Sequence, residues 1–263
     1  MRYHKGSVGL NHVKDKALLH FVADSRFVTR SQLNSFALFE YCEINRRVFN
    51  WRLQRLAEAG LIRKQVLPYL DGEALYSITR AGVQALEQLG VYYLGGNLER
   101  EKDAREFQIP HALELNNIRI ALKARGHLLV WIPEVFVRVL NLSPATAYAK
   151  VYDGIAEVSL DGEHIKFGIE YERTFKSQPK YDKIWEAIES EKRLNAFLYL
   201  VPNTTLLWGL VREFKGTKRP VYFGLVDEFK EKVFDADVWS ASYDRSTLRS
   251  ALLQAARASK GQS

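Results

Sequence analysis

The chain has 263 residues, of which 47% are hydrophobic and 26% charged, and this composition excludes disordered, collagen-like and disulfide-scaffold proteins. Its formal net charge is +7, from 38 Lys and Arg against 31 Asp and Glu, which favours polyanions as partners. Residues 1–100 carry 14 Lys and Arg against 9 Asp and Glu, so we expect nucleic-acid contacts there first. The length predicts two domains, or one domain with a sizeable appendage.

The sequence contains one cysteine, Cys42, which cannot form a disulfide within the chain or build a cysteine-rich metal site. A reducing compartment is the simplest interpretation. Residues 1–16 lack the apolar centre of a signal peptide, and no apolar run approaches the roughly 18–20 residues that span a bilayer. We therefore expect a cytoplasmic protein that does not bind membranes.

The first predicted elements are short helices. An apolar stripe over residues 17–22 predicts the first helix, and Thr29 with Gln32 forms the capping-box pattern that begins a second. Asn45 is the expected N-cap of a third helix that continues to Gly60.

A two-stranded wing is predicted after the third helix. Its hairpin turn is expected at Asp71-Gly72, and Thr79 is expected to cap a closing helix. This order of elements resembles the winged helix-turn-helix family over residues 14–90. The segments Leu53–Ile62 and Leu75–Leu86 resemble the end of the family's third helix and its junction between wing and helix. The resemblance implies a DNA-binding domain.

The third helix has a predicted DNA-contacting face. If Phe49, Leu53 and Leu56 pack inward, a rotation of 100° per residue turns polar side chains outward. Arginine pairs with guanine, asparagine and glutamine pair with adenine, and cations on the wing neutralise phosphates. The residues that we expect to contact DNA are Arg46, Arg47, Asn50, Trp51, Gln54, Arg55, Arg63 and Lys64. The alternatives are a merely solvated face or a protein-binding module, with Trp51 packed against the wing or a dimer partner.

The remainder of the chain predicts a linker at 91–108, a second domain at 109–240, and a carboxyl-terminal helix and tail at 241–263. The domain opens with a helix that ends at Gly126. Strands are expected at 128–132, 136–140, 149–160, 165–173, 197–201 and 221–226, and further helices at 179–193 and 204–215. The predicted fold class is α/β (α+β overall), with a mixed sheet flanked by helices.

Three carboxylates form the most informative pattern of the second domain. Asp153 lies in one predicted strand, and Glu170 and Glu172 lie two residues apart in the next, so strand periodicity turns both glutamates to one face. Hard oxygen ligands that converge in this way suit a divalent metal. The alternative is an acidic, solvated face.

This pattern resembles the PD-(D/E)XK, or restriction-endonuclease-like, superfamily. The resemblance implies a site for Mg²⁺ or Mn²⁺ made by Asp153, Glu170 and an assisting Glu114 on the preceding helix. The sequence departs from the motif at Tyr152, where the family has proline, and at Glu172, where it has lysine. The resemblance still places Glu172 among the catalytic residues. Because the motif's lysine is absent, Lys176 or Lys180 is expected to supply its positive charge.

The whole chain also resembles the replication-relaxation family of plasmids and mobile elements. The segments that carry this resemblance are residues 111–126, Trp131–Glu134, 152–154, 168–173 and the helix that begins near Lys180-Tyr181. It implies DNA transactions on mobile elements. The expected partners are double-stranded DNA, a second copy of the chain in a homodimer, and proteins of a replication, relaxation or transposition complex. The second domain then either cuts or nicks DNA or has lost activity. In the latter case the chain is a transcriptional regulator or a scaffolding accessory.

Overall fold

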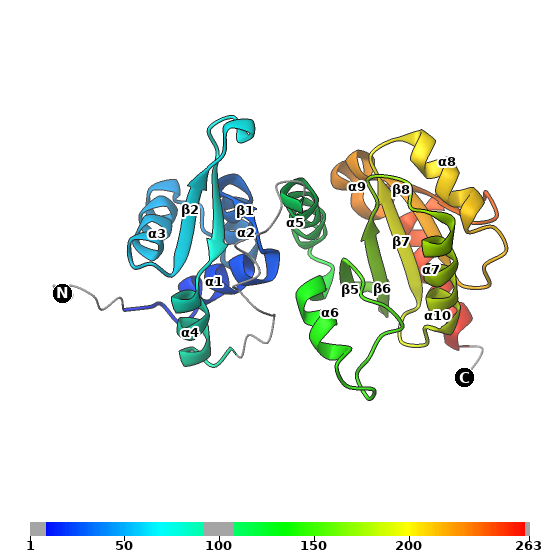
Figure 1. Ribbon diagram of the computed structural model, residues 1–263, viewed down its shortest axis with the longest axis horizontal. Coiled ribbons are helices and arrows are strands. Elements are labelled where there is room, and N and C mark those ends of the chain that lie inside the picture. The colour runs from blue at the N-terminus through cyan, green and yellow to red at the C-terminus, as the bar shows by residue number, and fades with distance from the viewer. Residues whose placement is uncertain (1–8, 92–107, 261–263) are drawn as a thin grey trace. The chain divides into compact units, whose positions relative to one another are not determined.

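The computed structural model describes residues 9–91 and 108–260. The chain forms two compact units, Met1–Ile120 and Ala121–Ser263 (Figure 1). The helix α5 (Gln108–Ala124) crosses this division. Of the predicted linker, residues 92–107 lie outside the described residues.

The first unit contains helices around a small antiparallel sheet with the strand order β1-β3-β2. Its elements are α1 (Lys14–Ser25), β1 (Val28–Thr29), α2 (Arg30–Tyr41), α3 (Arg46–Glu58), β2 (Ile62–Val66), the 3₁₀ helix η1 (Pro68–Leu70), β3 (Ala74–Ile78), α4 (Arg80–Gln88) and the first part of α5. This is the element order predicted for residues 14–90, with β1 added to the predicted hairpin.

Local sequence signals set the helix starts of this unit. The Thr29 hydroxyl accepts a hydrogen bond from the Gln32 amide while the Gln32 side chain accepts one from the Thr29 amide, which completes the predicted capping box. Asn45 caps α3 and Thr79 caps α4, also as predicted. The wing turn is longer than predicted, because η1 lies within the loop that joins Val66 to Ala74.

The core of the first unit lies between α1, α2, α3, α4 and the sheet. Phe49, Leu53 and Leu56 of α3 are buried in it, as the helical periodicity predicts. Two polar side chains of α5 attach this helix to the same unit: Asn116 Nδ2 donates to the Phe27 carbonyl at 2.7 Å, and Asn117 Oδ1 accepts from Gln32 Nε2 at 2.7 Å. These contacts place the part of α5 before Ala121 with the first unit.

The second unit is built on a seven-stranded mixed sheet with the order β10-β9-β8-β7-β6-β5-β4. Its strands are β4 (Leu128–Pro133), β5 (Gly154–Leu160), β6 (Glu163–Tyr171), β7 (Ala196–Val201), β8 (Val221–Leu225), β9 (Asp237–Ser240) and β10 (Arg245–Thr247). The pairs β6–β7 and β7–β8 are parallel and the other pairs are antiparallel. The predicted class, α/β with a mixed sheet, is confirmed.

Helices cover both faces of this sheet. They are α6 (Glu134–Leu140), α7 (Gln178–Ser190), α8 (Thr204–Glu213), α9 (Val226–Lys232) and α10 (Leu248–Lys260), with the 3₁₀ helix η3 (Val233–Asp235) after α9. Tyr181 of α7 and Leu210 of α8 share one buried cluster with Phe197 and Tyr199 of β7, so α7 and α8 lie on the same face. The helix α10 contacts β6 and β7 from the opposite face (Figure 1).

The structure corrects three predicted elements of this unit. Residues 136–140, predicted as a strand, belong to α6, whose Val137 is fully buried in the core. The strand predicted at 149–160 begins only at Gly154, so Asp153 directly precedes it. The short strands β9 and β10 were not predicted. Within the described part of the chain, no helix is both long and apolar enough to cross a membrane.

Candidate nucleic-acid interface and acidic site

The helix α3 presents polar side chains away from the core of the first unit. Arg46, Arg47 and Gln54 are exposed, and Trp51 is 58% exposed, so these predicted DNA contacts are accessible. Asn50 is half-buried because its side-chain oxygen accepts from Arg30 Nε at 3.1 Å and from Nη2 at 2.9 Å. Arg30, at the start of α2, was not predicted as part of this surface.

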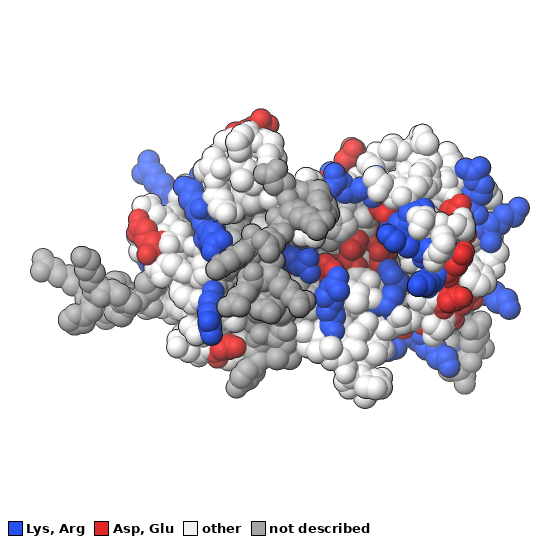
Figure 2. All heavy atoms as spheres, viewed as in Figure 1, with Lys and Arg blue, Asp and Glu red and all other residues white. Residues whose placement is uncertain are grey.

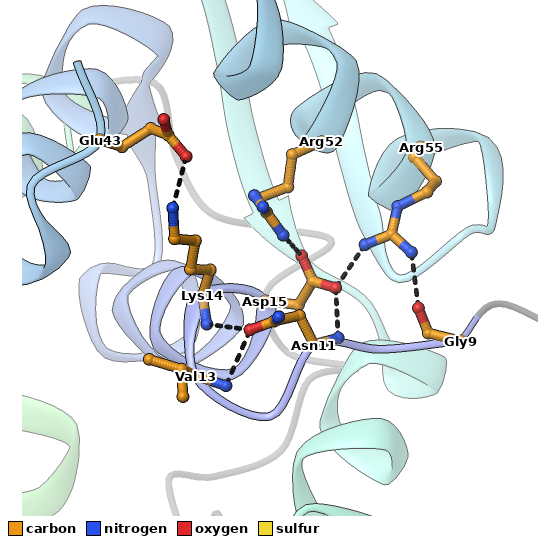
Figure 3. A network of polar contacts seen from close by, with 8 residues as sticks. All are labelled: Gly9, Asn11, Val13, Lys14, Asp15, Glu43, Arg52 and Arg55. Carbon is orange, nitrogen blue, oxygen red and sulfur yellow. Dashed lines mark hydrogen bonds and ion pairs between the residues drawn. The ribbon is translucent and has the colours of Figure 1, made fainter. Parts of the chain in front are cut away.

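Arg55 was predicted to point outward from α3, but its side chain is half-buried. Its guanidinium is ion-paired with Asp15 of α1 and donates to the Gly9 carbonyl at 2.7 Å (Figure 3). The guanidinium also lies 5.1 Å from the centroid of the Trp51 ring. Periodicity fixes the direction of this side chain, but it does not reveal a carboxylate 40 residues earlier in the sequence. The structure therefore assigns Arg55 to the packing of α1 against α3.

A groove of about 990 Å³ lies between α2, α3 and the wing. Cations line it from three elements, with Arg30 on α2, Arg46 on α3 and Lys64 on β2. Arg63, the other predicted phosphate contact of the wing, is exposed. At one end of the groove the Glu73 carboxylate accepts from the Ser31 amide at 2.6 Å. The polar lining of this groove suits a phosphate backbone.

Two of the predicted acids lie opposite each other on neighbouring antiparallel strands. Gly154 pairs with Ile169, so the next position along each strand places Asp153 opposite Glu170. The Asp153 carboxylate also accepts a hydrogen bond from the Tyr171 amide at 2.9 Å. In the neighbouring strand Glu170 pairs with Tyr199, so both carboxylates lie on the sheet face that α7 and α8 cover.

Two lysines compensate the acids of this site. Lys150 is ion-paired with Glu170, and Lys176 is ion-paired with Glu172. We call Asp153, Glu170, Glu172, Lys150 and Lys176 the acid–lysine cluster. Lys176, one of the two lysines predicted to replace the missing cation, lies beside Glu172, and its catalytic role stays a prediction. Lys150 was missed, although it lies only three residues before Asp153.

Burial and mutual charge shift the pKa values of this cluster. Burial raises the pKa of Glu170 above its ordinary value, the Asp153 charge raises it further, and Lys150 opposes both. Burial lowers the pKa of Lys176, against the charges of Glu170 and Asp153. The cluster therefore holds charged groups in surroundings from which water is largely removed.

A buried glutamate that the sequence did not single out holds the segment before Asp153. Glu191 is 2% exposed, and its Oε2 accepts from the Ala149 amide at 2.8 Å and from the Tyr152 hydroxyl at 3.4 Å. Burial and the Glu191 charge raise the pKa of Tyr152. These contacts position the segment that carries Lys150 and Asp153.

The other predicted site residues are less closely connected. Lys180 is exposed on the first turn of α7, and its charge contributes to the lowered pKa of Lys176. Glu114 belongs to the part of α5 in the first unit, and its assisting role stays a prediction. Among the described residues, no group of three or more His, Cys, Asp or Glu side chains is arranged to hold a metal ion. Figure 2 shows acidic side chains of the second unit among Lys and Arg side chains.

Comparisons with known proteins give little further information. No family model matches the chain, and the search of curated proteins returned no match. Among solved structures, the chain is similar to the restriction endonuclease FokI bound to DNA, with 11% sequence identity and a TM-score of 0.27. The match covers 82% of this chain and 43% of that one, so the chain spans less than half of the FokI chain. Chains with so low a TM-score need not share a fold.

Proposed function

We propose that the chain is a DNA-binding protein whose second unit cleaves phosphodiester bonds with a divalent metal. The observation that carries this proposal is the placement of Asp153 opposite Glu170, with Lys150 and Lys176 paired to acids of the same cluster. Two carboxylates beside half-buried ammonium groups provide ligands for a metal and compensation for a phosphate charge.

The order of elements around the cluster supports the proposal. The helix α5 is followed by the antiparallel strands β4, β5 and β6, then by α7 and the parallel strand β7. The helix α6 lies between β4 and β5, and the whole agrees with the mixed sheet flanked by helices that the sequence predicts for this domain. Asp153 directly precedes β5 and Glu170 lies near the end of β6, and these two strand ends are neighbours in the sheet.

The residues fit a metal site of two carboxylates. Proteins commonly hold Mg²⁺ with one or two carboxylates, and substrate phosphates and water complete its shell. Asp153 and Glu170 would supply these two ligands, whereas Lys176 neutralises Glu172. When bound, Mg²⁺ or Mn²⁺ polarises a phosphoryl oxygen and lowers the pKa of a bound water. Lys176 would lie beside the phosphate, and Glu191 would orient the segment that carries Lys150 and Asp153.

The first unit would locate the DNA. Its exposed arginines on α3 and its groove beside the wing suit the major groove and the flanking phosphates of double-stranded DNA. The role in replication, relaxation or transposition of a plasmid or mobile element, the homodimer and a cytoplasmic location are part of this proposal. The role rests on the short motifs of the sequence, and the location rests on its single cysteine, Cys42.

A second candidate function is a regulator that binds DNA without cutting it. The ion pairs of the cluster favour this alternative, because Glu170 and Glu172 each already have an ammonium partner and need no metal for charge balance. The first unit would then provide the DNA binding, and the second unit would be a scaffold without catalytic activity.

Incubation with supercoiled plasmid and Mg²⁺ or Mn²⁺ distinguishes the two functions. A nuclease produces open-circle or linear DNA, and Asp153→Asn or Glu170→Gln abolishes this product while the protein still binds DNA. Glu157→Gln is the matched control, because Glu157 lies farther along β5, opposite Lys166 of β6 and away from Asp153. Intact plasmid under every metal condition would refute cleavage and leave the regulator.

A further inference from the structure

Exposed aromatic rings gather beside α8 in the second unit. Trp208 of α8 is 42% exposed, Tyr243 is 50% exposed, and Phe175 is 52% exposed. Trp239 of β9 is half-buried and adjoins them. We call these four residues the aromatic patch.

The rings of the patch have a defined mutual geometry. The Trp208 and Tyr243 rings are stacked, with centroids 6.3 Å apart and an angle of 15° between their planes. The Trp208 and Trp239 rings meet edge to face, with centroids 5.5 Å apart. Trp208, Trp239 and Tyr243 are therefore packed rings rather than scattered side chains.

The backbone accommodates these rings at two positions. Tyr243 has a φ of +70°, a conformation that is unfavourable for a bulky residue and that recurs at functional sites. A Cβ at Gly209 would lie 2.1 Å from the Phe175 ring, so only glycine allows this ring to lie on α8. The backbone conformation at Tyr243 and the absence of a side chain at Gly209 therefore hold Tyr243 and Phe175 in these positions.

Among the described residues of this region, the exposed large hydrophobic side chains are all aromatic. Between residues 171 and 260, the exposed large hydrophobic side chains are Phe175, Trp185, Trp208 and Tyr243. Exposed aliphatic residues of the second unit lie elsewhere, such as Leu129 on β4 and Leu142 after α6. Exposed flat rings suit the stacking of nucleic-acid bases.

Cations lie next to the rings. The Arg245 guanidinium lies 5.9 Å from the centroid of the Trp239 ring and pairs with Asp237. Arg212 is exposed and lies one helical turn after Trp208. At the other end of the patch, Phe175 directly precedes Lys176 of the acid–lysine cluster. Phe175 thus connects the patch in sequence to the proposed cleavage site, and arginines lie close to Trp208 and Trp239.

We infer that the aromatic patch binds single-stranded DNA by stacking its unpaired bases. Aromatic platforms with flanking cations bind single strands in this way with little sequence preference. The inference deepens the proposed function by naming a single-stranded segment as part of its substrate. Binding is measured with metal removed, so a failure of cleavage and a failure of the patch are distinguishable.

The test uses the full chain and a fluorescein-labelled oligothymidylate, with anisotropy measured in EDTA at elevated salt. High salt weakens the phosphate contacts of the first unit more than it weakens stacking. Trp208→Ala is expected to weaken binding about tenfold or more, and Tyr243→Ala to do the same. Trp208→Phe keeps a ring and is expected to restore most of the affinity. Binding of a duplex should change less than about twofold.

The matched control is Phe136→Ala, which removes an exposed ring of the same unit from α6. It should leave the affinity for oligothymidylate unchanged. The inference is overturned if Trp208→Ala, with an unchanged melting temperature, binds oligothymidylate as tightly as the wild type. It is also overturned if Trp208→Ala dissociates a dimer in sedimentation, because the patch would then bind a second copy of the chain.

Discussion

Asp15 and Arg52 form a buried ion pair between α1 and α3. Asp15 Oδ1 accepts from Arg52 Nη1 at 2.6 Å, and the side chains are 0% and 9% exposed. The other carboxylate oxygen is paired with Arg55 and accepts from the Asn11 amide at 2.7 Å (Figure 3). One carboxylate therefore compensates two arginines of α3 and fixes this helix against α1.

Replacing Asp15 with alanine is expected to destabilise the first unit strongly. The substitution leaves buried guanidinium charge without compensation, which costs about 3–5 kcal/mol. The measurement is urea unfolding of the full chain followed by circular dichroism. Glu87→Ala, at an exposed position of α4, is the control and should change stability by less than about 0.5 kcal/mol. A normal midpoint for Asp15→Ala would contradict the role of this pair.

The sequence predicted the local features of α3 but not its partners. The cap at Asn45 and the apolar face of Phe49 and Leu53 follow from rules that act within a few residues, and the structure shows both. The burial of Arg52 depends on Asp15, which lies 37 residues away in the sequence. Periodicity gives the direction of a side chain, but only the packed fold decides which charges meet.

Substitutions on α3 and on the wing should affect DNA binding differently. Arg47→Ala and Gln54→Ala are expected to lower sequence preference, since each base contact contributes about 1–3 kcal/mol. Arg63→Ala and Lys64→Ala should weaken binding to every sequence, and each should reduce the salt slope by about 1 because one phosphate is no longer neutralised. Electrophoretic mobility shifts over a salt series, with specific and random duplexes, measure both effects.

Arg80→Ala is the matched control for these variants. Arg80 is exposed at the start of α4, outside α3 and the wing. Its replacement should leave both affinity and salt slope close to the wild type. If Arg80→Ala lowers affinity as much as Arg63→Ala does, DNA binding depends on the total positive charge of the unit and not on an interface formed by α3 and the wing.

The core position of Leu53 gives a prediction about the helix phase. Leu53 is 2% exposed among the apolar side chains of the first unit, so Leu53→Ala should cost about 2–5 kcal/mol. Chemical denaturation measures this decrease in stability, and DNA binding should fall with the folded fraction. Val48→Ala, at a residue that is 37% exposed on the same helix, should cost much less. Equal costs would mean that another face of α3 packs inward.

In the second unit, the sequence located the acids better than the elements around them. Alternating positions brought Glu170 and Glu172 to one side, and the register places Asp153 opposite Glu170. The run of β-branched residues in 135–139 favoured a strand, yet tertiary packing of Val137 holds it in α6. Lys150 was missed because its pairing with Glu170 depends on the turn of the chain before β5.

Metal binding gives the last prediction. If Asp153 and Glu170 hold a divalent ion, Mg²⁺ or Mn²⁺ should raise the melting temperature, because a ligand that binds only the folded state stabilises it by RT ln(1 + [L]/Kd). At a hundredfold excess over Kd this is about 2.7 kcal/mol, which differential scanning fluorimetry detects as a shift of several degrees. Na⁺ at matched ionic strength separates specific divalent binding from screening.

Asp153→Ala should remove the metal-dependent shift while the first unit still binds DNA. Glu157→Ala, farther along the same strand, should keep the shift. Lys150→Met tests the charge balance, because removing the ammonium that pairs with Glu170 frees this carboxylate for the metal and should increase the shift. A wild-type chain that shows no shift with either metal, together with intact plasmid, would identify the acid–lysine cluster as a structural ion-pair network and leave DNA binding by the first unit as the function.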